Sequence, residues 1–254
     1  MADLPPHFTV DLNCDMGEGM PGDGAIFPFI SSANIACGGH AGDDATMRRS
    51  VELALEYGVA IGAHPSYPDR SGFGRIDIFD SLPLDTLLSD LKTQIASLQS
   101  ICYAKGTRLH HVKPHGALYN RAARDPGAST VICEVVAAID PSLIIYGLAG
   151  SQTRLAAQTA GLRFVNEVFA DRTYRADGSL TPRSEPFALI HDPATMLNQV
   201  LTMVGRQQVR TSEGKTIPII AETICLHGDG DDPVKFASII RRALDQHEIT
   251  VGAP

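Results

Sequence analysis

Four histidines of this 254-residue sequence, His40, His64, His115 and His227, each close a short apolar run. Each run then leads into Gly, Pro or a polar loop. An apolar run that ends on an ionisable residue is typical of a buried parallel strand, which delivers that side chain to one rim of a sheet. Because α/β barrels keep their active sites at the carboxyl rim, we expect the four histidines to form one polar cluster there. The sequence therefore predicts an enzyme.

Acidic side chains follow two further apolar runs, VDLNCDMGE and RFVNEVFAD. They are Asp11, Asp15 and Glu18 in the first run, and Glu167 and Asp171 in the second. Strand alternation places Asp11, Asn13 and Asp15 on one side, toward the axis of a barrel if there is one. Burying three polar groups is costly without partners, a cation or a substrate, so this motif favours a functional site. The alternative is an Asx turn in which Asp15 only caps a loop.

Two other segments place polar groups at the same rim. Lys113 ends an apolar strand and shares a face with His115. A lysine in that position needs a carboxylate or a ligand phosphate as its partner. In the segment CGGHAGD, Gly38 and Gly39 permit close approach of a ligand to the backbone before His40, and leave N–H groups free to hold an oxyanion.

Two competing kinds of site receive less support. The loop 17–22 matches GxGxxG, but a dinucleotide site needs a helix to begin there, and no helical pattern precedes Asp43. The sequence also lacks GxxxxGK[ST], so a Walker-type ATP site is not expected in this chain. Cys14, Cys37 and Cys225 lie near strand ends. A catalytic thiolate needs a nearby imidazolium, however, and we expect buried, inert cysteines.

Strand-like and helix-like segments alternate along the chain with short connections. The expected strands are 8–14, a second ending at 34–37, 59–63, 109–113, 143–148, 164–169 and 219–226. The expected helices are 44–57 with a cap at Asp43 or Asp44, 84–104 with a cap at Ser81, 128–138, 152–160, 193–205 and 233–247, besides a hairpin over 209–217. Repeated βα units imply parallel, right-handed crossovers. Seven strands predict a distorted (β/α) barrel formed by residues 1–254 as a single domain, with a doubly wound open sheet as the alternative.

The composition argues against several classes of protein. A net charge of −8 and a pI near 5.5 disfavour nucleic acid or an anionic membrane as a partner. The sequence has no apolar run of about 18 residues, the length of a transmembrane helix, and its start lacks the pattern of a signal peptide. Five cysteines without a CxxC pair indicate reduced thiols. We therefore expect a cytoplasmic protein.

Six segments together resemble the LamB/YcsF family. They are DLNCDMGE (11–18), NIACGGHAGD (34–43), GAHPSYP (62–68), VKPHGALYN (112–120), EVFADRTY (167–174) and LHG (226–228). The resemblance spans nearly the whole chain and implies a distorted seven-stranded TIM-like barrel of the glycoside hydrolase/deacetylase type. It also implies a role in an ATP-dependent 5-oxoprolinase, a complex with separate subunits B and C that converts 5-oxo-L-proline to L-glutamate. Association of this chain with copies of itself is left open.

The resemblance also implies roles for the rim residues. Catalysis is expected from Asp15, Lys113, His115 and His227, and substrate binding from Asn13, Glu18, His64, Tyr119, Asp171 and Arg172. Opening a lactam needs a positioned water, a base and donors for the oxyanion, and Asp15 or a histidine would activate the water. Coupling to ATP implies an O-phosphorylated lactam whose charge Lys113 or Arg172 would offset. ATP is therefore expected as a co-substrate whose binding needs the partner subunits.

A divalent metal is a further expectation from the resemblance. Barrel deacetylases of related fold bind one through an aspartate and two histidines, and Asp15, His40 and His115 offer these donors. Two alternative functions remain. One is a stand-alone metal-dependent amidohydrolase or deacetylase that uses the same rim. The other is a non-catalytic subunit that only binds the substrate.

Overall fold

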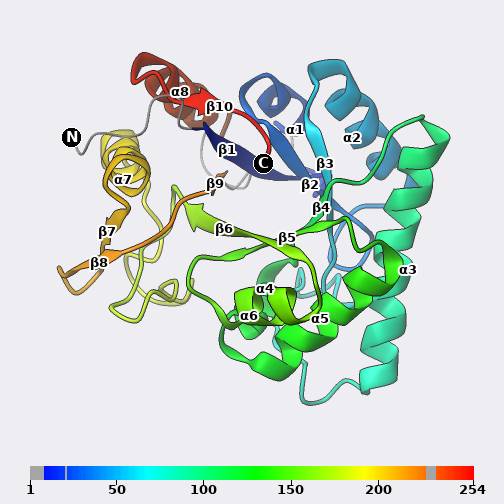
Figure 1. The fold of residues 1–254 in the computed structure, drawn as a ribbon. Coiled ribbons are helices and arrows are strands. Elements are labelled where there is room, and N and C mark those ends of the chain that lie inside the picture. Colours follow the sequence, from blue (N-terminus) through cyan, green and yellow to red (C-terminus); the bar gives the residue numbers. More distant parts are fainter. Residues whose placement is uncertain (1–8, 21, 227–232) are drawn as a thin grey trace.

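A ring of parallel strands forms the centre of the structure, a computed structural model that describes residues 9–20, 22–226 and 233–254 (Figure 1). Around the ring the strands are β1 (Thr9–Met16), β2 (Ser32–Ala36), β3 (Ala60–His64), β4 (His111–Val112), β5 (Ile144–Leu148), β6 (Arg163–Phe169) and β9 (Thr223–Leu226). Because β1 pairs with both β2 and β9, the ring closes. Within the described residues, this confirms the predicted seven-stranded barrel and excludes the open sheet.

Helices surround the barrel on its outside. They are α2 (Asp44–Tyr57), α3 (Leu84–Ala104), α4 (Gly116–Arg124), α5 (Pro126–Ile139), α6 (Gln152–Thr159), α7 (Pro193–Arg206) and α8 (Pro233–Gln246). Figure 1 shows α7 and the hairpin of β7 (Gln208–Arg210) and β8 (Thr216–Pro218) on the side of the barrel opposite α3. The short strand β10 (Thr250–Val251) pairs with the start of β1 outside the ring.

Most helix boundaries follow local signals in the sequence. Asp43 caps α2 through a capping box with Thr46, in which each side chain accepts from the backbone amide of the other residue. Gly58 then ends α2 with a φ of 67°, the left-handed conformation that favours glycine. The predicted cap at Ser81 is wrong, because its hydroxyl donates to the carbonyl of Ile78 and α3 begins only after Pro83.

Helical segments in two regions differ from the expectation. α4 begins at Gly116, a residue that is typical of a loop, so its pattern was not recognised as helical. Gly116 has a φ of 55°, and a Cβ there would lie 2.6 Å from the carbonyl oxygen of Gly74, so glycine is required at this close approach. In the other region, the helices α1 (Asp23–Ile26) and η1 (Phe27–Phe29) follow β1. With four residues, α1 is too short to form the phosphate-binding helix of a dinucleotide site.

The inside of the barrel is polar, and the main apolar core lies outside it, against the helices. Along β1 the buried residues Val10, Leu12 and Cys14 belong to the main hydrophobic cluster. The alternate residues Asp11, Asn13 and Asp15 are also buried but form hydrogen bonds to polar side chains from other parts of the barrel. These partners are Ser32, Asn34, Lys113, Glu167 and Thr223. The predicted one-sided arrangement is therefore present, and Asp15 pairs with side chains across the barrel.

His111 connects this buried polar network to Tyr146. Its ring stacks on Tyr146 with a centroid separation of 4.0 Å, and its Nε2 lies 2.8 Å from Oδ1 of Asn34. Asn34 in turn donates to Asn13 and Asp15, so its Oδ1 must accept from His111. Burial lowers the pKa of His111 well below its ordinary value, with a smaller contribution from positive charge at His110.

This burial predicts a pH dependence of stability in the metal-free chain. Below pH 6.5 the unfolded chain protonates His111 whereas the folded chain does not, so stability falls as the pH falls. One such proton changes the free energy of unfolding by about 1.4 kcal/mol per pH unit. We expect His111→Gln, which keeps a donor for Asn34, to reduce the slope between pH 6.5 and 5.0 by roughly that amount. Urea unfolding at several pH values with EDTA present measures this, and an unchanged slope would contradict it.

Candidate active site and metal centre

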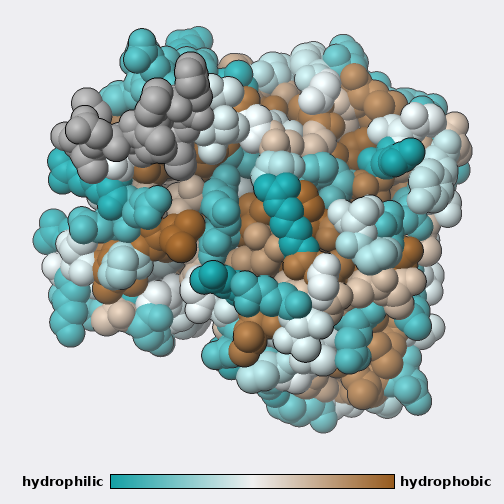
Figure 2. Space-filling view, in the orientation of Figure 1, coloured by the Kyte–Doolittle hydropathy of each residue, from teal (hydrophilic) through white to brown (hydrophobic). Residues whose placement is uncertain are grey.

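A cavity of about 1260 Å³ opens at the carboxyl rim of the barrel. Five of the chemically active side chains that line it come from the ends of β1, β3 and β4: Asp15, Glu18, His64, Lys113 and His115. Its other walls come from segments that follow β5 and β6 and from residues around β8. In Figure 2 the surface is hollowed between the part formed by β7 and β8 and the part formed by α4 to α6. Strands far apart in the sequence therefore deliver their polar ends to one place.

Lys113 lies at the centre of a buried ion-pair network. Its Nζ is 2.8 Å from Oδ1 of Asp15 and 2.9 Å from Oε1 of Glu167. Burial favours the neutral amine, but the two carboxylates outweigh it and raise the pKa of Lys113 well above its ordinary value. Nζ also lies 3.0 Å from Sγ of Cys225. Lys113 is therefore a fixed ammonium group, held by carboxylates as its position at the end of an apolar strand predicts.

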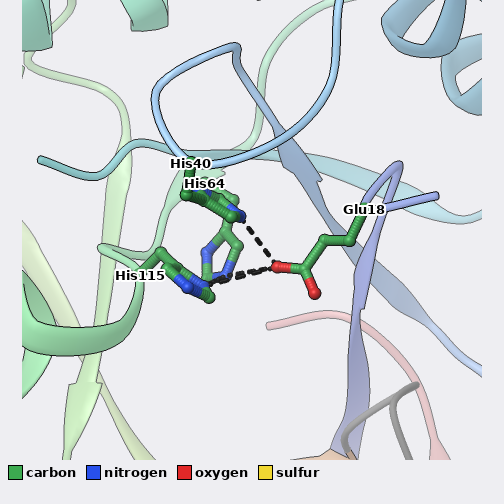
Figure 3. A group of neighbouring side chains, drawn as sticks. All are labelled: Glu18, His40, His64 and His115. Carbon is green, nitrogen blue, oxygen red and sulfur yellow. Dashed lines mark hydrogen bonds and ion pairs between the residues drawn. The ribbon is translucent and has the colours of Figure 1, made fainter. Parts of the chain in front are cut away.

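Glu18 and three histidines form a second, adjacent cluster. Ligand atoms of Glu18, His40, His64 and His115 all lie within 4.8 Å of one another (Figure 3). Oε1 of Glu18 is 2.8 Å from Nε2 of His40, 3.4 Å from Nδ1 of His115 and 3.8 Å from Nε2 of His64. The rings of His40 and His115 are stacked, with centroids 3.6 Å apart. The four side chains thus converge on one small volume beside the cavity.

Backbone carbonyls fix the tautomers of two of these histidines. Nδ1 of His64 lies 2.7 Å from the carbonyl oxygen of Lys113, and Nε2 of His115 lies 3.0 Å from that of Phe73. Because a carbonyl can only accept, both of these ring nitrogens carry protons. In neutral rings the opposite nitrogens are lone-pair donors, and these two nitrogens are 3.0 Å apart and face the Glu18 carboxylate. Such converging acceptors require a shared proton or a cation between them.

The electrostatics favour neutral imidazoles, the form that binds metals. Burial lowers the pKa of His40 and of His115, and the electrostatic influence of the adjacent His64 imidazole acts in the same direction on both. Nδ1 of His40 is buried and has no hydrogen-bond partner among the described residues. Three neutral imidazoles and one carboxylate are donors that suit a divalent transition metal such as zinc, and carbonyl partners of the kind seen here orient metal-binding histidines. The donor set therefore fits a metal ion.

The loop 66–75 holds the histidines in place and was not identified from the sequence. Phe73 adopts a φ of 54°, its carbonyl accepts from His115, and its ring lies edge-on to His40 with centroids 5.2 Å apart. A Cβ on Gly74 would lie 3.0 Å from both His115 and His40, so a larger residue would crowd the cluster. The signal in the sequence is the Gly-Phe-Gly segment at 72–74, which was not interpreted as functional.

Asp23 also helps to position the cluster, and it was not predicted from the sequence. Its Oδ2 accepts from the backbone amide of Gly17 at 3.0 Å, which fixes the turn that carries Glu18. Gly17 has a φ of 72°, so the chain reverses there immediately after β1. Burial raises the pKa of Asp23 to about 6. An aspartate in a glycine-rich loop is common, so its type and position alone did not distinguish it.

The structure places Asp15 beside the histidine cluster. Oδ1 of Asp15 accepts from Lys113 and from Asn34, and its Oδ2 is 3.3 Å from Nε2 of His64. Of the predicted metal ligands Asp15, His40 and His115, the two histidines belong to the four-residue cluster, which also contains Glu18 and His64. A role of Asp15 as a ligand stays a prediction.

The remaining predicted site residues lie at different depths. Asn13 is buried in the barrel, where its side chain donates to Glu167 and Thr223. Tyr119 and Arg172 are buried and line the cavity. Asp171 follows β6 next to Arg172, and its charge acts on that guanidinium. His227 lies outside the described residues.

The cysteines have the environment of inert residues. Burial raises the pKa of Cys37 to about 12 and that of Cys14 and Cys225 well above the ordinary value. A nucleophilic thiolate needs the opposite shift. The expectation of buried, unreactive thiols therefore agrees with the structure.

Comparison with known proteins identifies close relatives over nearly the whole chain. The sequence model of the LamB/YcsF family matches residues 10–254. The A subunit of 5-oxoprolinase from Bordetella parapertussis is 49% identical over 252 residues, which cover 96% of this chain and 98% of that protein. The A subunit of 5-oxoprolinase from Bordetella pertussis is also 49% identical over 252 residues, which again cover 96% of this chain and 98% of that protein. The crystal structure of the lactam utilization protein from Thermus thermophilus has a TM-score of 0.90 and 39% identity, and covers 97% of this chain and 100% of that one.

Helices that could cross a membrane are not found in the described part of the chain. Within residues 9–20, 22–226 and 233–254, every helix is too short or too polar to cross a bilayer.

Proposed function

Because the chain belongs to the LamB/YcsF family, we propose that it opens the lactam ring of 5-oxo-L-proline to give L-glutamate, as one subunit of an ATP-dependent 5-oxoprolinase. Its partners would be subunits B and C, and the complex would work in the cytoplasm. The observation that carries the proposal is the placement of the Glu18–histidine cluster next to Lys113 and Asp15, at one end of the same cavity. A stable cyclic amide needs both a base and stabilisation of developing negative charge, and this site offers both.

The chain's own residues have distinct parts in this proposal. Glu18, His40, His64 and His115 would hold a divalent metal, which supplies Lewis acidity when bound. Asp15 lines the cavity, and its Oδ1 is anchored by Lys113, so it is oriented to accept a proton from the attacking water. The permanent ammonium of Lys113 stabilises negative charge as it develops on the lactam oxygen.

ATP enters the proposal as a co-substrate consumed with the help of subunits B and C. The lactam oxygen would take the terminal phosphoryl group of ATP, which releases ADP. Water would then attack the activated ring carbon, and the carbon–nitrogen bond would break as the nitrogen takes a proton, which gives the acyl phosphate of the ring-opened product. A second water would hydrolyse this acyl phosphate to the carboxylate of glutamate and inorganic phosphate. Supporting this division of work, the sequence of this chain contains no Walker-type loop.

Reconstitution from purified subunits tests this function. The chain alone is expected to consume neither ATP nor 5-oxo-L-proline at a useful rate, whereas addition of subunits B and C produces glutamate and ADP together. His115→Ala in this chain is expected to reduce glutamate formation by at least about 1000-fold while the chain stays folded, because a cluster that acts as a unit fails when one member is lost. His247→Gln, a change at the end of α8, serves as the matched control.

Two outcomes would favour the alternative functions. Rapid hydrolysis of a lactam or an acetamide by the isolated chain without ATP would indicate a stand-alone metal-dependent amidohydrolase. Full activity of a complex that carries both Asp15→Asn and His115→Ala would leave this chain only the role of binding the substrate.

A further inference from the structure

Arg172 is a buried cation that forms no salt bridge with a carboxylate of the described residues. It lies three residues beyond the end of β6, is 5% exposed and lines the same cavity as Lys113. One Nη donates to the carbonyl oxygen of Thr181, while Nε has no hydrogen-bond partner among the described residues. None of the salt bridges found in the described part of the chain involves this guanidinium. Burying an incompletely paired guanidinium opposes folding, so its presence calls for an explanation.

The surroundings of Arg172 would stabilise an added negative charge. Burial lowers the pKa of Arg172, and the positive charge of Arg183 lowers it further, although Asp171 opposes this. Arg154 and Arg183 line the same cavity. This positive region occurs in a chain whose net charge is −8, so it is a local feature of the cavity and not of the whole surface.

The backbone that carries Arg172 is firmly held. Nε2 of Gln199 on α7 donates to the carbonyl oxygens of Phe169, Ala170 and Arg172, at 3.0, 3.2 and 2.9 Å. The hydroxyl of Tyr174 accepts from the backbone amide of Phe169 at 2.7 Å. A side chain supported in this way is preorganised, as a residue that recognises a ligand needs to be.

Phe169 lines the same cavity as Arg172 and lies close to Lys113. Its ring lines the cavity, and Nζ of Lys113 lies 5.5 Å from the ring centroid. A five-membered lactam placed on this ring with its carbonyl near Lys113 would turn the opposite side of its ring toward the rest of the cavity, which Arg172 also lines. In the proposed substrate that other side carries a carboxylate.

We propose that Arg172 binds the carboxylate of the substrate, so that this chain selects lactams that carry a carboxylate next to the ring nitrogen. This inference rests on the proposed function and names the group that the site recognises. A guanidinium presents a planar pair of donors that matches a carboxylate, and its hydrogen bonds to a charged acceptor are strong. Arg172 is then a specificity-determining residue, and the chemistry at Lys113 and the histidine cluster is separate from it.

The test compares 5-oxo-L-proline with its carboxamide, 5-oxo-L-prolinamide, in the complete complex with ATP. Ring opening of the two substrates gives glutamate and isoglutamine, respectively. We expect the unmodified complex to prefer the carboxylate by at least about 100-fold in kcat/KM, because a site built around a charged partner strongly rejects a neutral analogue. Arg172→Gln should reduce that preference to within about fivefold, mainly through a higher KM for 5-oxo-L-proline, and Arg172→Lys should retain part of it.

Arg163→Gln is the matched control, because Arg163 is an exposed arginine at the opposite end of β6. Its complex should keep the full preference. An equal loss for both substrates in Arg172→Gln would show that Arg172 only supports the structure, and an undiminished preference would show that it does not bind the carboxylate. Either result overturns the proposal while leaving the proposed ring opening intact.

A binding measurement keeps the inference testable if the complex does not turn over. Calorimetric titration of the isolated chain should show that 5-oxo-L-proline binds at least about tenfold more tightly than the carboxamide, and that Arg172→Gln removes the difference. Equal binding of both compounds, with competition by inorganic phosphate that depends on Arg172, would assign the guanidinium to a phosphoryl group and contradict the proposal. Absence of ring opening by the unmodified complex would instead count against the proposed function.

Discussion

The purified chain is expected to bind one divalent transition-metal ion. His64→Ala is expected to weaken that binding by at least about 100-fold, because even the loss of a residue that only orients a metal ligand lowers metal affinity by about 10- to 100-fold. The physical reason is the arrangement of acceptors. Nε2 of His64 and Nδ1 of His115 lie 3.0 Å apart and face Glu18. In neutral rings both nitrogens are lone-pair donors, so a bound cation stabilises this arrangement. Metal content after dialysis and competition with a chromophoric chelator measure the affinity. His247→Gln should leave the affinity unchanged.

A pair of carboxylate variants identifies the oxygen ligand. Glu18→Gln should reduce metal affinity strongly, whereas Asp15→Asn should change it only a few-fold, because Asp15 is already committed to Lys113 and Asn34. The reverse result would support the set of Asp15, His40 and His115 that the family resemblance implies. Retention of full affinity by both variants and by His64→Ala would contradict a metal centre at this rim.

The position of the site could be predicted from the sequence because strand direction constrains it strongly. Parallel strands that end at one rim must bring their last residues together, so His64, Lys113 and His115 were placed correctly from their position after apolar runs. The pairing of Lys113 with carboxylates followed from the cost of burying an unpaired ammonium. The period of a strand and the energy of burial are enough to determine both features.

The choice between Glu18 and Asp15 could not be predicted in the same way. Asp15 lies on β1, where alternation fixes its direction, and it points into the barrel toward Lys113. Glu18 lies beyond the reversal at Gly17, and its direction depends on the hydrogen bond from that turn to Asp23. Loop geometry of this kind arises from contacts that a linear pattern does not encode. The same limit explains why the contribution of Phe73 to the histidine cluster was missed.

Replacing Lys113 with methionine is expected to reduce both the stability of the chain and the activity of the complex strongly. The change removes the ammonium that holds Asp15 and Glu167, whose side chains are 7% and 0% exposed. Breaking a buried pair in this way leaves uncompensated charge and costs about 3–5 kcal/mol. The same change should reduce turnover of the reconstituted complex by at least about 100-fold, because a preorganised group that stabilises developing charge is lost. Urea unfolding and glutamate formation measure the two effects.

A compensating variant separates the two roles of Lys113. Combining Lys113→Met with Asp15→Asn and Glu167→Gln removes the unpaired charges, so most of the lost stability should return, since buried ion pairs contribute little net stability over neutral replacements. Activity should not return, because the ammonium and the carboxylate of Asp15 are both absent. Lys105→Met, which breaks the exposed pair with Glu52, should leave stability nearly unchanged, because exposed ion pairs are screened by solvent. If the triple variant stayed as unstable as Lys113→Met, the loss would have to arise from packing, and a Lys113→Met complex with full turnover would exclude Lys113 from the chemistry.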